Sequence, residues 1–392
     1  MSPSFPPEIF DVIIDHLHDE PTALQACCLV SKSWIPRTRT HLFAHVVFYG
    51  PKSPVERWKK TFPDPSNSPA CYTRTLSIRG LPVVTAADMG AGGWIRTFHS
   101  VEHLELECHG HGEVDNRARL IPFYGLSSTV KSLHLSFTPF GVFDLVCSFP
   151  LLEDLALLSL LPEMDADTWN VHLTSPKLTG TLELRLFGQI QFVTRRLLNL
   201  PNGLHFTKIV LECFQREEIE LATGLVFGCS RTLESLDVKF AKSAFSPVMN
   251  GQYLAANPLL PLVAAGAYPM PLLGLSSATK LKDVTFRLVK VAPQWITMAL
   301  QTVNLKNLQQ VVIQSYVTTD PTEETVRREW EDLDHLLVHF RTTHSVRLQV
   351  VHEAVEGNEL GAHVLSLLPE LAKRGLVEIV DPHQNRAVII RA

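Results

Sequence analysis

One short stretch of the sequence holds most of the side chains that could do chemistry together. Residues 108–113 read Cys-His-Gly-His-Gly-Glu, so a thiol, two imidazoles and a carboxylate lie within six residues. Zn²⁺ prefers these ligand types, but structural zinc sites usually join two ligand pairs that are well separated in the chain. Four ligands on one turn cannot easily surround a tetrahedral ion. The spacing favours an exposed loop, and we expect no metal site and no cofactor.

Other catalytic patterns are weak. The sequence contains no G-x-S-x-G, no G-x-x-x-x-G-K, no G-x-G-x-x-G and no H-E-x-x-H motif. Two Gly-Leu-Ser-Ser runs, at residues 125–128 and 274–277, are similar to nucleophile turns, but serine beside glycine is common in ordinary turns. We therefore expect a non-catalytic protein. A hydrolase concealed among divergent strands is the last of three alternatives.

The elements that surround these residues begin with a small N-terminal helical bundle. Pro6 and Pro7 can open a helix because a first-turn N–H has no intrahelical partner. An apolar stripe at helical spacing follows, formed by Ile9, Phe10, Ile13, Ile14 and Leu17. The turn at residues 19–21 should end this first helix.

A second helix is predicted from Thr22, because Thr22 and Gln25 form a capping-box signature. Its inner face would consist of Leu24, Cys27, Cys28, Ser31 and Ile35. A third short helix near His41 would complete the bundle.

The types of residue in this region, and the order in which they follow one another, resemble the F-box family. The matching residues are Phe5-Pro6-Pro7-Glu8-Ile9, Leu17, Leu24, the run Cys28-Leu29-Val30-Ser31-Lys32-Ser33-Trp34, and Leu42-Phe43. Phe5 departs from the family, in which leucine is the commoner opening residue. The resemblance covers about an eighth of the chain. A plain helical cap on a larger domain is the alternative reading of this segment.

Within the F-box family, the helical module binds a Skp-type adaptor and, through it, a cullin. The resemblance therefore implies a substrate-recognition subunit of a Skp–cullin–F-box E3 ubiquitin ligase, and the runner-up is an F-box scaffold that acts outside the ligase. A bundle of about forty-five residues buries little surface alone, which also favours a partner. The expected adaptor-binding residues are Pro6, Glu8, Ile9, Ile13, Leu17, Leu24, Leu29, Val30, Trp34 and Phe43.

Beyond residue 72 the chain repeats a short strand with alternating apolar residues. One core residue per strand can be taken from Leu76, Leu104, Leu133, Leu155, Leu182, Ile209 and Leu236, at intervals of 28, 29, 22, 27, 27 and 27 residues. Val284 and Val311 are again 27 residues apart. This interval fits a strand, a turn and a return segment, as in leucine-rich repeats.

The sequence therefore predicts an α/β fold: a leucine-rich-repeat-like solenoid of parallel strands with helical or irregular returns. It is similar to the divergent arrays that follow F-boxes in fungal proteins. Helical returns are expected at residues 140–147, 218–229 and 294–303. An ordinary α/β domain is the alternative, but an open sheet has no reason to keep its strands 27 residues apart.

These features divide the chain into an F-box module at residues 1–48, a Pro-rich linker at 49–72 and the solenoid at 73–392. An insertion at 241–280 lengthens one interval to 48 residues and would either pack over the array or form a buried divergent repeat. From about residue 322, a charged amphipathic helix, two strands and a further helix would cap the open end of the array.

We expect a protein substrate, whose identity the sequence does not show, to bind the strand face and the insertion. The expected contacts are Glu105, His134, Asp237, Lys239, Tyr253 and Tyr268.

Composition narrows the functional class. The 392 residues are 45% hydrophobic and 19% charged, as in globular proteins. A net charge of −5 without long basic runs argues against a general nucleic-acid binder. Because no eighteen-residue apolar run or signal peptide is present, we expect no membrane association and a cytoplasmic or nuclear protein. Seven cysteines without C-x-x-C spacing predict reduced thiols.

Overall fold

The structure is a computed structural model of the 392-residue chain. It describes residues 6–50, 53–80, 93–107, 120–126, 128–136, 142–158, 176–185, 190–213, 216–240, 273–289, 294–304, 306–316, 324–344, 347–352, 366–374, 378–381 and 386–389. The chain forms two compact units, Met1–Lys177 and Leu178–Ala392. Among the described residues, no helix combines the length and the apolar character that crossing a membrane requires.

The first unit begins with three α-helices and a 3-10 turn. These are α1 (Pro7–His16), α2 (Pro21–Val30), η1 (Lys32–Trp34) and α3 (Ile35–Leu42). Each α-helix has a proline in its first turn. Backbone N–H groups in a first turn have no partner within the helix, so a proline, which lacks this N–H, costs nothing there and favours a helix start at that position. Three short helices were expected here, and they are present.

The boundaries of the second helix differ from the expectation. The capping box at Thr22 is wrong, because α2 begins at Pro21 after Glu20 and no side chain caps it. The helix ends at Val30, so Ser31 does not continue its inner face. Instead the Ser31 hydroxyl accepts a bond of 3.3 Å from the Ser33 N–H at the start of η1.

Among the described residues of the first unit, five parallel strands follow, each beside its neighbour in sequence. They are β1 (His45–Tyr49), β2 (Thr75–Arg79), β3 (His103–Glu107), β4 (Ser132–Ser136) and β5 (Asp154–Leu158). The core residues chosen from the sequence share one register position: Leu76, Leu104, Leu133 and Leu155. All four are fully buried. The predicted parallel strands are therefore confirmed for this unit.

Glycines extend the ladder past the first two strands. Gly50 and Gly80 follow β1 and β2 with φ of 87° and 81°, a region that favours glycine. Their N–H groups donate to the carbonyls of Arg79 and Glu107, each at 2.7 Å. The chain can thus turn away from the sheet without losing its last inter-strand bond.

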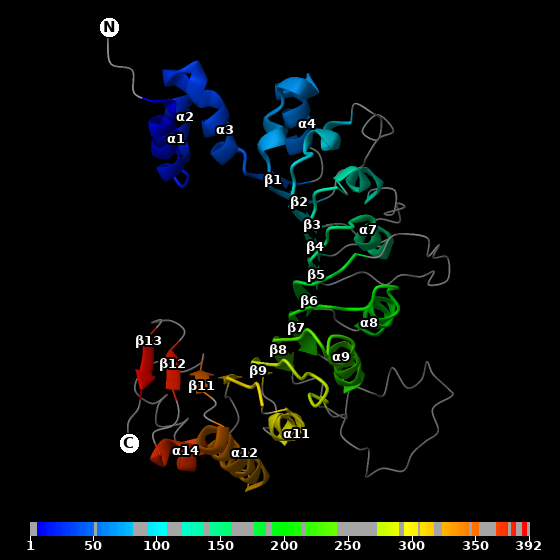
Figure 1. The fold of residues 1–392 in the computed structure, drawn as a ribbon, viewed down its shortest axis with the longest axis vertical. Helices are drawn as coiled ribbons and strands as arrows, with labels where there is room; N and C mark the ends of the chain where they lie inside the picture. Colours follow the sequence, from blue (N-terminus) through cyan, green and yellow to red (C-terminus); the bar gives the residue numbers. More distant parts are fainter. Residues whose placement is uncertain are drawn as a thin grey trace. The chain divides into compact units, whose positions relative to one another are not determined.

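Short helical returns lie on one side of these strands (Figure 1). They are α4 (Ser53–Thr61), η2 (Pro65–Asn67), η3 (Pro69–Tyr72), η4 (Trp94–Thr97), η5 (Ile121–Leu126) and α7 (Val142–Ser148). The helix expected at residues 140–147 corresponds to α7. Most other returns here are 3-10 turns, which agrees with the expectation of irregular returns.

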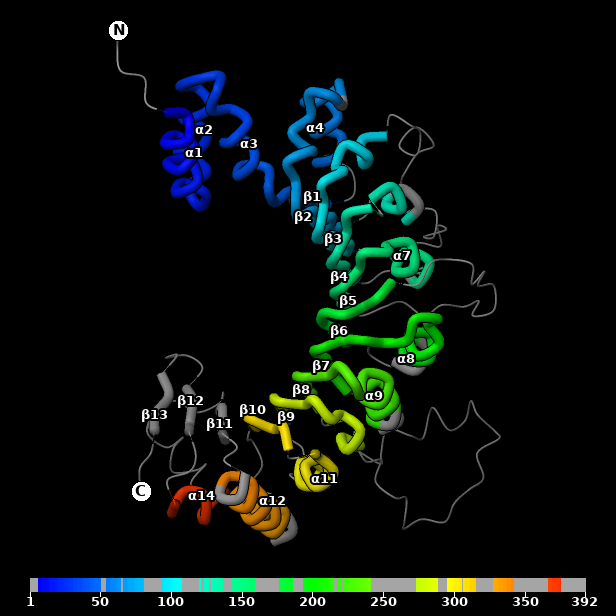
Figure 2. The backbone as a smooth tube through the Cα atoms, in the orientation of Figure 1, coloured from blue at the N-terminus to red at the C-terminus, as the bar shows by residue number. Residues whose placement is uncertain are grey.

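The expected boundary after residue 48 and the linker at 49–72 both need revision. Strand β1 spans this boundary and pairs with β2 over five residues. Helix α4 and η3 then form the first return, where Val55 and Ala70 are buried. Figure 2 follows the backbone from α3 through β1 into α4. Residues 45–72 are therefore the first strand and return of the array.

An aromatic cluster joins the helical bundle to this first return. Its members are Phe43, Phe48, Trp58, Phe62, Trp94 and Phe98. The Trp58 ring centroid lies 4.9 Å from that of Phe62, 5.5 Å from that of Phe98 and 5.7 Å from that of Phe48. The Phe43 centroid, from the end of the bundle, lies 6.1 Å from it in an edge-on contact. Such pairs add to the stabilisation that burial provides.

In its described residues, the second unit has eight strands in sequential order. They are β6 (Thr181–Arg185), β7 (Lys208–Cys213), β8 (Ser235–Phe240), β9 (Asp283–Val289), β10 (Gln310–Tyr316), β11 (Arg347–His352), β12 (Glu378–Asp381) and β13 (Arg386–Ile389). All pair in parallel except β12 and β13, which are antiparallel. The expected core residues Leu182, Ile209, Leu236, Val284 and Val311 again share one register position.

The long interval before β9 leaves the sheet continuous. Strands β8 and β9 pair directly over six residues, from Ser235 and Asp283 to Phe240 and Leu288. No further strand separates them, so the alternative of a buried extra repeat in the sheet is excluded. Residues 241–272 of the expected insertion lie outside the described residues.

Helical returns of the second unit lie on one side of its strands (Figure 1). They are α8 (Ile190–Leu198), α9 (Arg216–Gly228), α11 (Gln294–Gln301), α12 (Glu324–His344) and α14 (Pro369–Lys373). The helices expected at residues 218–229 and 294–303 are α9 and α11, and the amphipathic helix expected from about residue 322 is α12. Helix α8 and strand β13 were not expected.

Helix α12 buries the apolar face that its spacing predicted and also a carboxylate. Trp330, Leu333 and Leu337 are buried. Between them, Asp334 accepts bonds from the N–H groups of Glu370 and Leu371, at 2.6 and 3.0 Å. Those N–H groups start α14 and have no intrahelical partner, so Asp334 satisfies them across the helix pair.

Replacing the central aromatic residue of the cluster should loosen the first return. We expect Trp58→Ala to lower the free energy of unfolding by about 2–3 kcal/mol, because a partly buried indole is removed and a cavity remains. Urea denaturation followed by circular dichroism measures this change. Arg57→Ala, an exposed position on the same helix, is the control and should stay within about 0.5 kcal/mol of the wild type. Equal effects of the two substitutions would contradict this role of Trp58.

The cysteines should differ sharply in reactivity. Cys213 and Cys229 are buried. Burial raises the pKa of the Cys213 thiol and raises that of Cys229 to about 12, so both remain protonated and unreactive. Cys27 and Cys28 on α2 are partly exposed. Mapping of iodoacetamide adducts should show early labelling of Cys27 and Cys28, and labelling of Cys213 and Cys229 only in urea. Labelling of Cys213 in the folded chain at the rate of Cys28 would disprove this expectation.

Candidate partner-binding surfaces

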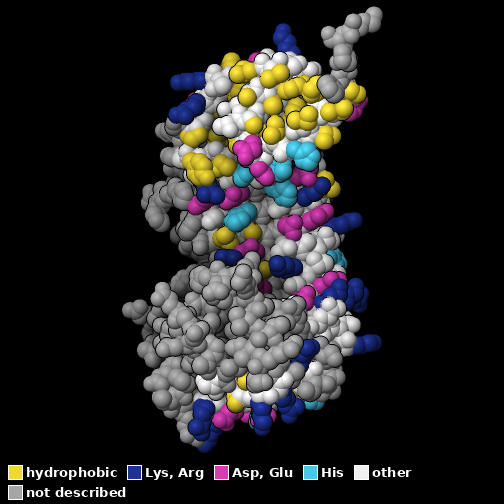
Figure 3. Space-filling view, turned by 90° about the vertical axis from the view of Figure 1, so that its left-hand side faces the viewer, with side chains coloured by type: hydrophobic (Ala, Val, Ile, Leu, Met, Phe, Trp, Pro, Cys, Tyr) yellow, Lys and Arg dark blue, Asp and Glu magenta, His cyan; other side chains and the backbone are white. Residues whose placement is uncertain are grey.

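Helices α1 and α2 expose an unusual amount of apolar surface. Five large hydrophobic side chains there are 44 to 89% exposed, and we call them the apolar cluster: Ile9, Val12, Ile13, Leu29 and Val30. Figure 3 shows hydrophobic side chains gathered over these helices, in the upper part of the view. Contiguous exposed apolar residues on a soluble protein commonly mark a binding surface. The apolar cluster is therefore the strongest candidate site in the described part of the chain.

The sequence of α1 explains why these residues remain outside. The helix is apolar on two faces. Ile14 is fully buried, and the Phe10 ring lies 5.0 Å from that of Trp34, so these residues form the inner face. Ile9, Val12 and Ile13 recur at i, i+3 and i+4, which places them together on the outer face. A helix that is apolar on both faces needs a second cover, and the bundle supplies only one.

The residues expected to bind an adaptor divide into three groups. Pro6, Glu8, Ile9, Ile13, Leu29 and Val30 are exposed. Leu17, Trp34 and Phe43 are partly exposed, and Trp34 and Phe43 also pack inside the unit, against Phe10 and against Trp58. Leu24 is 1% exposed and belongs to the core of the bundle, so its expected role as a contact residue is not supported.

Val12 belongs to the apolar cluster but was missed from the sequence. It was passed over because Ile9, Ile13 and Leu17 at four-residue spacing defined a single stripe. Its spacing could have identified it: Val12 lies three residues after Ile9, which places both on the same face of the helix, away from the inner face that Phe10 and Ile14 form.

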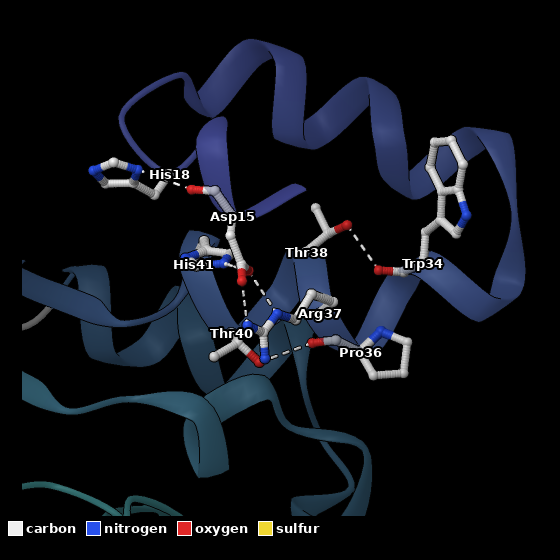
Figure 4. A network of polar contacts seen from close by, with 8 residues as sticks. All are labelled: Asp15, His18, Trp34, Pro36, Arg37, Thr38, Thr40 and His41. Carbon is white, nitrogen blue, oxygen red and sulfur yellow. Dashed lines mark hydrogen bonds and ion pairs between the residues drawn. The ribbon is translucent and has the colours of Figure 1, made fainter. Parts of the chain in front are cut away.

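A charged network fixes α1 against α3. Arg37 binds the Asp15 carboxylate through two nitrogens: its Nε donates to Oδ1 at 2.6 Å, and its Nη2 donates to Oδ2. His41 Nε2 lies 2.8 Å from the same Oδ1 (Figure 4). Two-pronged arginine–carboxylate bonds fix orientation as well as distance. The network therefore sets how α1 presents its outer face.

The bonds from Arg37 and then from His41 hold the pKa of Asp15 well below its ordinary value of 3.8. A carboxyl group whose pKa is lowered by folding stabilises the fold above its unfolded pKa. This stabilisation is lost progressively as the pH falls from the unfolded pKa of 3.8 through the lowered, folded value. The network is thus intact at neutral pH and fails in acid.

Removing this charge should loosen α1. We expect faster hydrogen exchange of residues 7–16 in Asp15→Asn than in the wild type at pH 7. The neutral amide of asparagine has only one acceptor oxygen, so it cannot replace the charged carboxylate that accepts both bonds from Arg37. The difference should persist down to a pH near 3.8 and narrow below it. Hydrogen exchange with mass spectrometry measures both. Glu8→Gln removes an exposed charge from the same helix and should leave the exchange unchanged; equal exchange in the two variants would refute the role of Asp15.

Two of the expected substrate-binding residues lie together on the strand face of the first unit. Glu105 on β3 and His134 on β4 are register partners, and both are partly exposed. The Arg79 guanidinium lies 3.6 Å from the Glu105 carboxylate and 3.7 Å from that of Glu107. It also lies 5.2 Å from the centre of the Tyr49 ring, a cation–π contact.

Two further expected residues lie on β8 of the second unit, and the structure separates their roles. Lys239 is partly exposed and its Nζ lies 2.6 Å from Glu212 Oε1. Asp237 is buried and accepts two bonds from Arg287, at 2.9 and 2.6 Å. The expectation that Asp237 is an exposed contact is therefore wrong, and its carboxylate instead fixes Arg287.

Most of the remaining sequence candidates lie outside the described residues. Tyr253, Tyr268 and the Cys-His-Gly-His-Gly-Glu stretch at 108–113 lie outside the described residues. Within the described residues, no three His, Cys, Asp or Glu side chains are grouped closely enough to hold a metal ion. The turn after Gly274 has a structural role, because the Gly274 N–H donates to Thr223 Oγ1 at 3.3 Å.

Comparison with known proteins adds no relative. No protein-family model matches the chain, and no curated protein matches its sequence. The F-box resemblance of the N-terminal residues therefore remains a prediction from the sequence, and the functional argument depends on the surfaces described above.

Proposed function

We propose that this protein is a substrate-recognition subunit of a Skp–cullin–F-box E3 ubiquitin ligase. In this proposal the apolar cluster binds a Skp-type adaptor, and the strand array, a divergent leucine-rich-repeat-like solenoid, binds a protein substrate. The observation that carries it is the exposure of the apolar cluster, with Leu29 at 89%, on a segment whose residues resemble an F-box.

The chemistry of the apolar cluster favours a protein partner. The five exposed aliphatic side chains on α1 and α2 carry no charge, and the exposed Glu8 and Asp11 lie beside them on α1. An apolar centre with a polar rim is the usual composition of a protein–protein interface. A bundle of this size buries little surface within itself, so a cover over this face would add to its stability.

The joint between the bundle and the array supports a role in positioning. Phe43 of the bundle, Phe48 of β1 and Trp58 of α4 pack in one aromatic cluster, so adaptor-binding and strand-bearing segments of the first unit are fixed to each other. A receptor needs such a fixed joint, because the ubiquitin chemistry is done by other subunits and the receptor only holds the substrate.

A scaffold that binds a Skp-type adaptor but acts outside the ligase is the alternative. The two functions share the apolar cluster and differ in whether a cullin joins the complex. Recovery of a cullin together with the adaptor separates them, and recovery of the adaptor alone favours the scaffold.

Charge placed in the apolar cluster should abolish adaptor binding. We expect Leu29→Asp to eliminate copurification with a Skp-type adaptor, and Leu29→Ala to weaken it by about 2 kcal/mol, or roughly thirtyfold, as for a central interface residue. Titration calorimetry with the purified adaptor measures the affinity.

The matched control is Phe227→Asp, which changes a 70%-exposed apolar residue on α9 of the second unit and should leave adaptor binding unchanged. Because Leu29 is exposed in the free chain, its replacement should not unfold the bundle, and circular dichroism checks this. Full adaptor affinity in Leu29→Asp would exclude the proposed use of this surface.

A further inference from the structure

One stretch of the second unit differs in charge from the chain as a whole. Residues 178–316, which contain β6 to β10, carry thirteen Lys and Arg and eight Asp and Glu, a net charge of +5. The entire chain has a net charge of −5. Positive charge is therefore concentrated in one stretch of the strand array.

On the strand face of this stretch, each cationic side chain is more exposed to solvent than the carboxylate that binds it. Lys239 is 37% exposed and its partner Glu212 13%, while Arg287 is 40% exposed and its partner Asp237 12%. Arg185, at the end of β6, lies 2.7 Å from Glu183 and is also the more exposed partner. A molecule that approaches this face therefore meets ammonium and guanidinium groups first.

The register places these groups side by side. Glu212, Lys239 and Arg287 occupy the same position on β7, β8 and β9, so Lys239 and Arg287 project from neighbouring strands. Each is bound to a largely buried carboxylate of the preceding strand. Those carboxylates hold the cations in one orientation, which lowers the entropic cost when a partner binds them.

More cations lie at the opposite end of the same strands. The turns before adjacent parallel strands meet at one edge of a sheet. Exposed cations occupy this edge at the start of β7 and before β8, β9 and β10: Lys208, Arg231, Lys280 and Lys306. Glu234 and Asp283 lie at this edge too, so the cations there outnumber the carboxylates, whereas at the other end each cation is paired with one carboxylate.

We infer that the strand face of β6–β9 binds an acidic segment of the protein substrate, with Arg185 and Lys239 among its contacts and Glu212 and Asp237 as positioning residues. This inference rests on the proposed receptor function and specifies the chemistry of its substrate. Separate Asp and Glu side chains can reach the cations between the carboxylates of the face. A continuous phosphate backbone would meet Glu183, Glu212 and Asp237 as well, so an acidic protein fits better than a nucleic acid.

The test uses the purified full-length chain and a fluorescein-labelled poly-glutamate peptide, with fluorescence anisotropy as the readout. We expect saturable binding that weakens as salt is raised, and no binding of a poly-lysine peptide. Replacing both Arg185 and Lys239 with Gln should raise the dissociation constant about tenfold. Unchanged affinity of that variant would overturn the inference, as would tighter binding of an oligothymidine strand than of the peptide.

Two further variants separate this surface from a general effect of charge. Arg195→Gln removes one exposed positive charge from α8, on a return helix, and should leave peptide binding unchanged. The double variant Glu212→Gln/Lys239→Gln keeps the net charge and leaves no carboxylate unpaired, yet it should bind as weakly as Lys239→Gln alone. Wild-type affinity in this double variant, or an equal loss in Arg195→Gln, would overturn the inference.

No adaptor is present in this assay. If the peptide does not bind, the acidic-segment inference fails, and the result says nothing against adaptor binding. If the adaptor does not bind in its own titration, the receptor function fails, and the peptide result is unaffected.

Discussion

In strands β1 to β10, an aliphatic side chain at one register position is buried because the side chains of neighbouring strands stand directly beside it. Leu104 lies between Leu76 and Leu133 in the first unit, and Leu236 lies between Ile209 and Val284 in the second. No single strand of five or six residues could bury its inner face alone. The parallel register, the helical returns on one side and the polar residues left on the other all depend on this stacking.

The same stacking determines where partners can bind. Returns cover the inner face of the strands, so the outer face keeps alternating residues such as Glu105 or Lys239 for contact. The N-terminal bundle differs from the strand array. Its helices cover only one face of α1 with other parts of the described chain, so the apolar cluster stays exposed. One molecule thus offers an apolar surface and charged surfaces, which suit two different partners in the proposed receptor.

Strand positions were predictable from the sequence because one apolar residue recurs at nearly constant spacing and must face the core. Strand β1 was not, because its residues directly follow a helical bundle, and only pairing with β2 reveals them as part of the array. Asp237 looked exposed because it alternates with core residues. Its burial depends on Arg287, which is fifty residues away in sequence and adjacent only after β8 and β9 pair. Val12 was missed because helical periodicity identifies apolar faces but not which of two faces the chain covers. Leu24 is buried on the inner face that its spacing predicted, and its expected adaptor contact came only from the F-box resemblance.

The antiparallel pairing of β13 has a consequence for self-association. A stack of parallel strands has an open end, to which the matching strand of another copy could add. Here the last strand of the second unit reverses direction, contains only four residues and begins with Arg386. Short, charged edge strands are a common defence against edge-to-edge aggregation. Because of the reversal at β13, a strand of a second copy that ran in the direction of β12 would have to pair with β13 in antiparallel fashion, so the parallel stack does not simply continue across this edge.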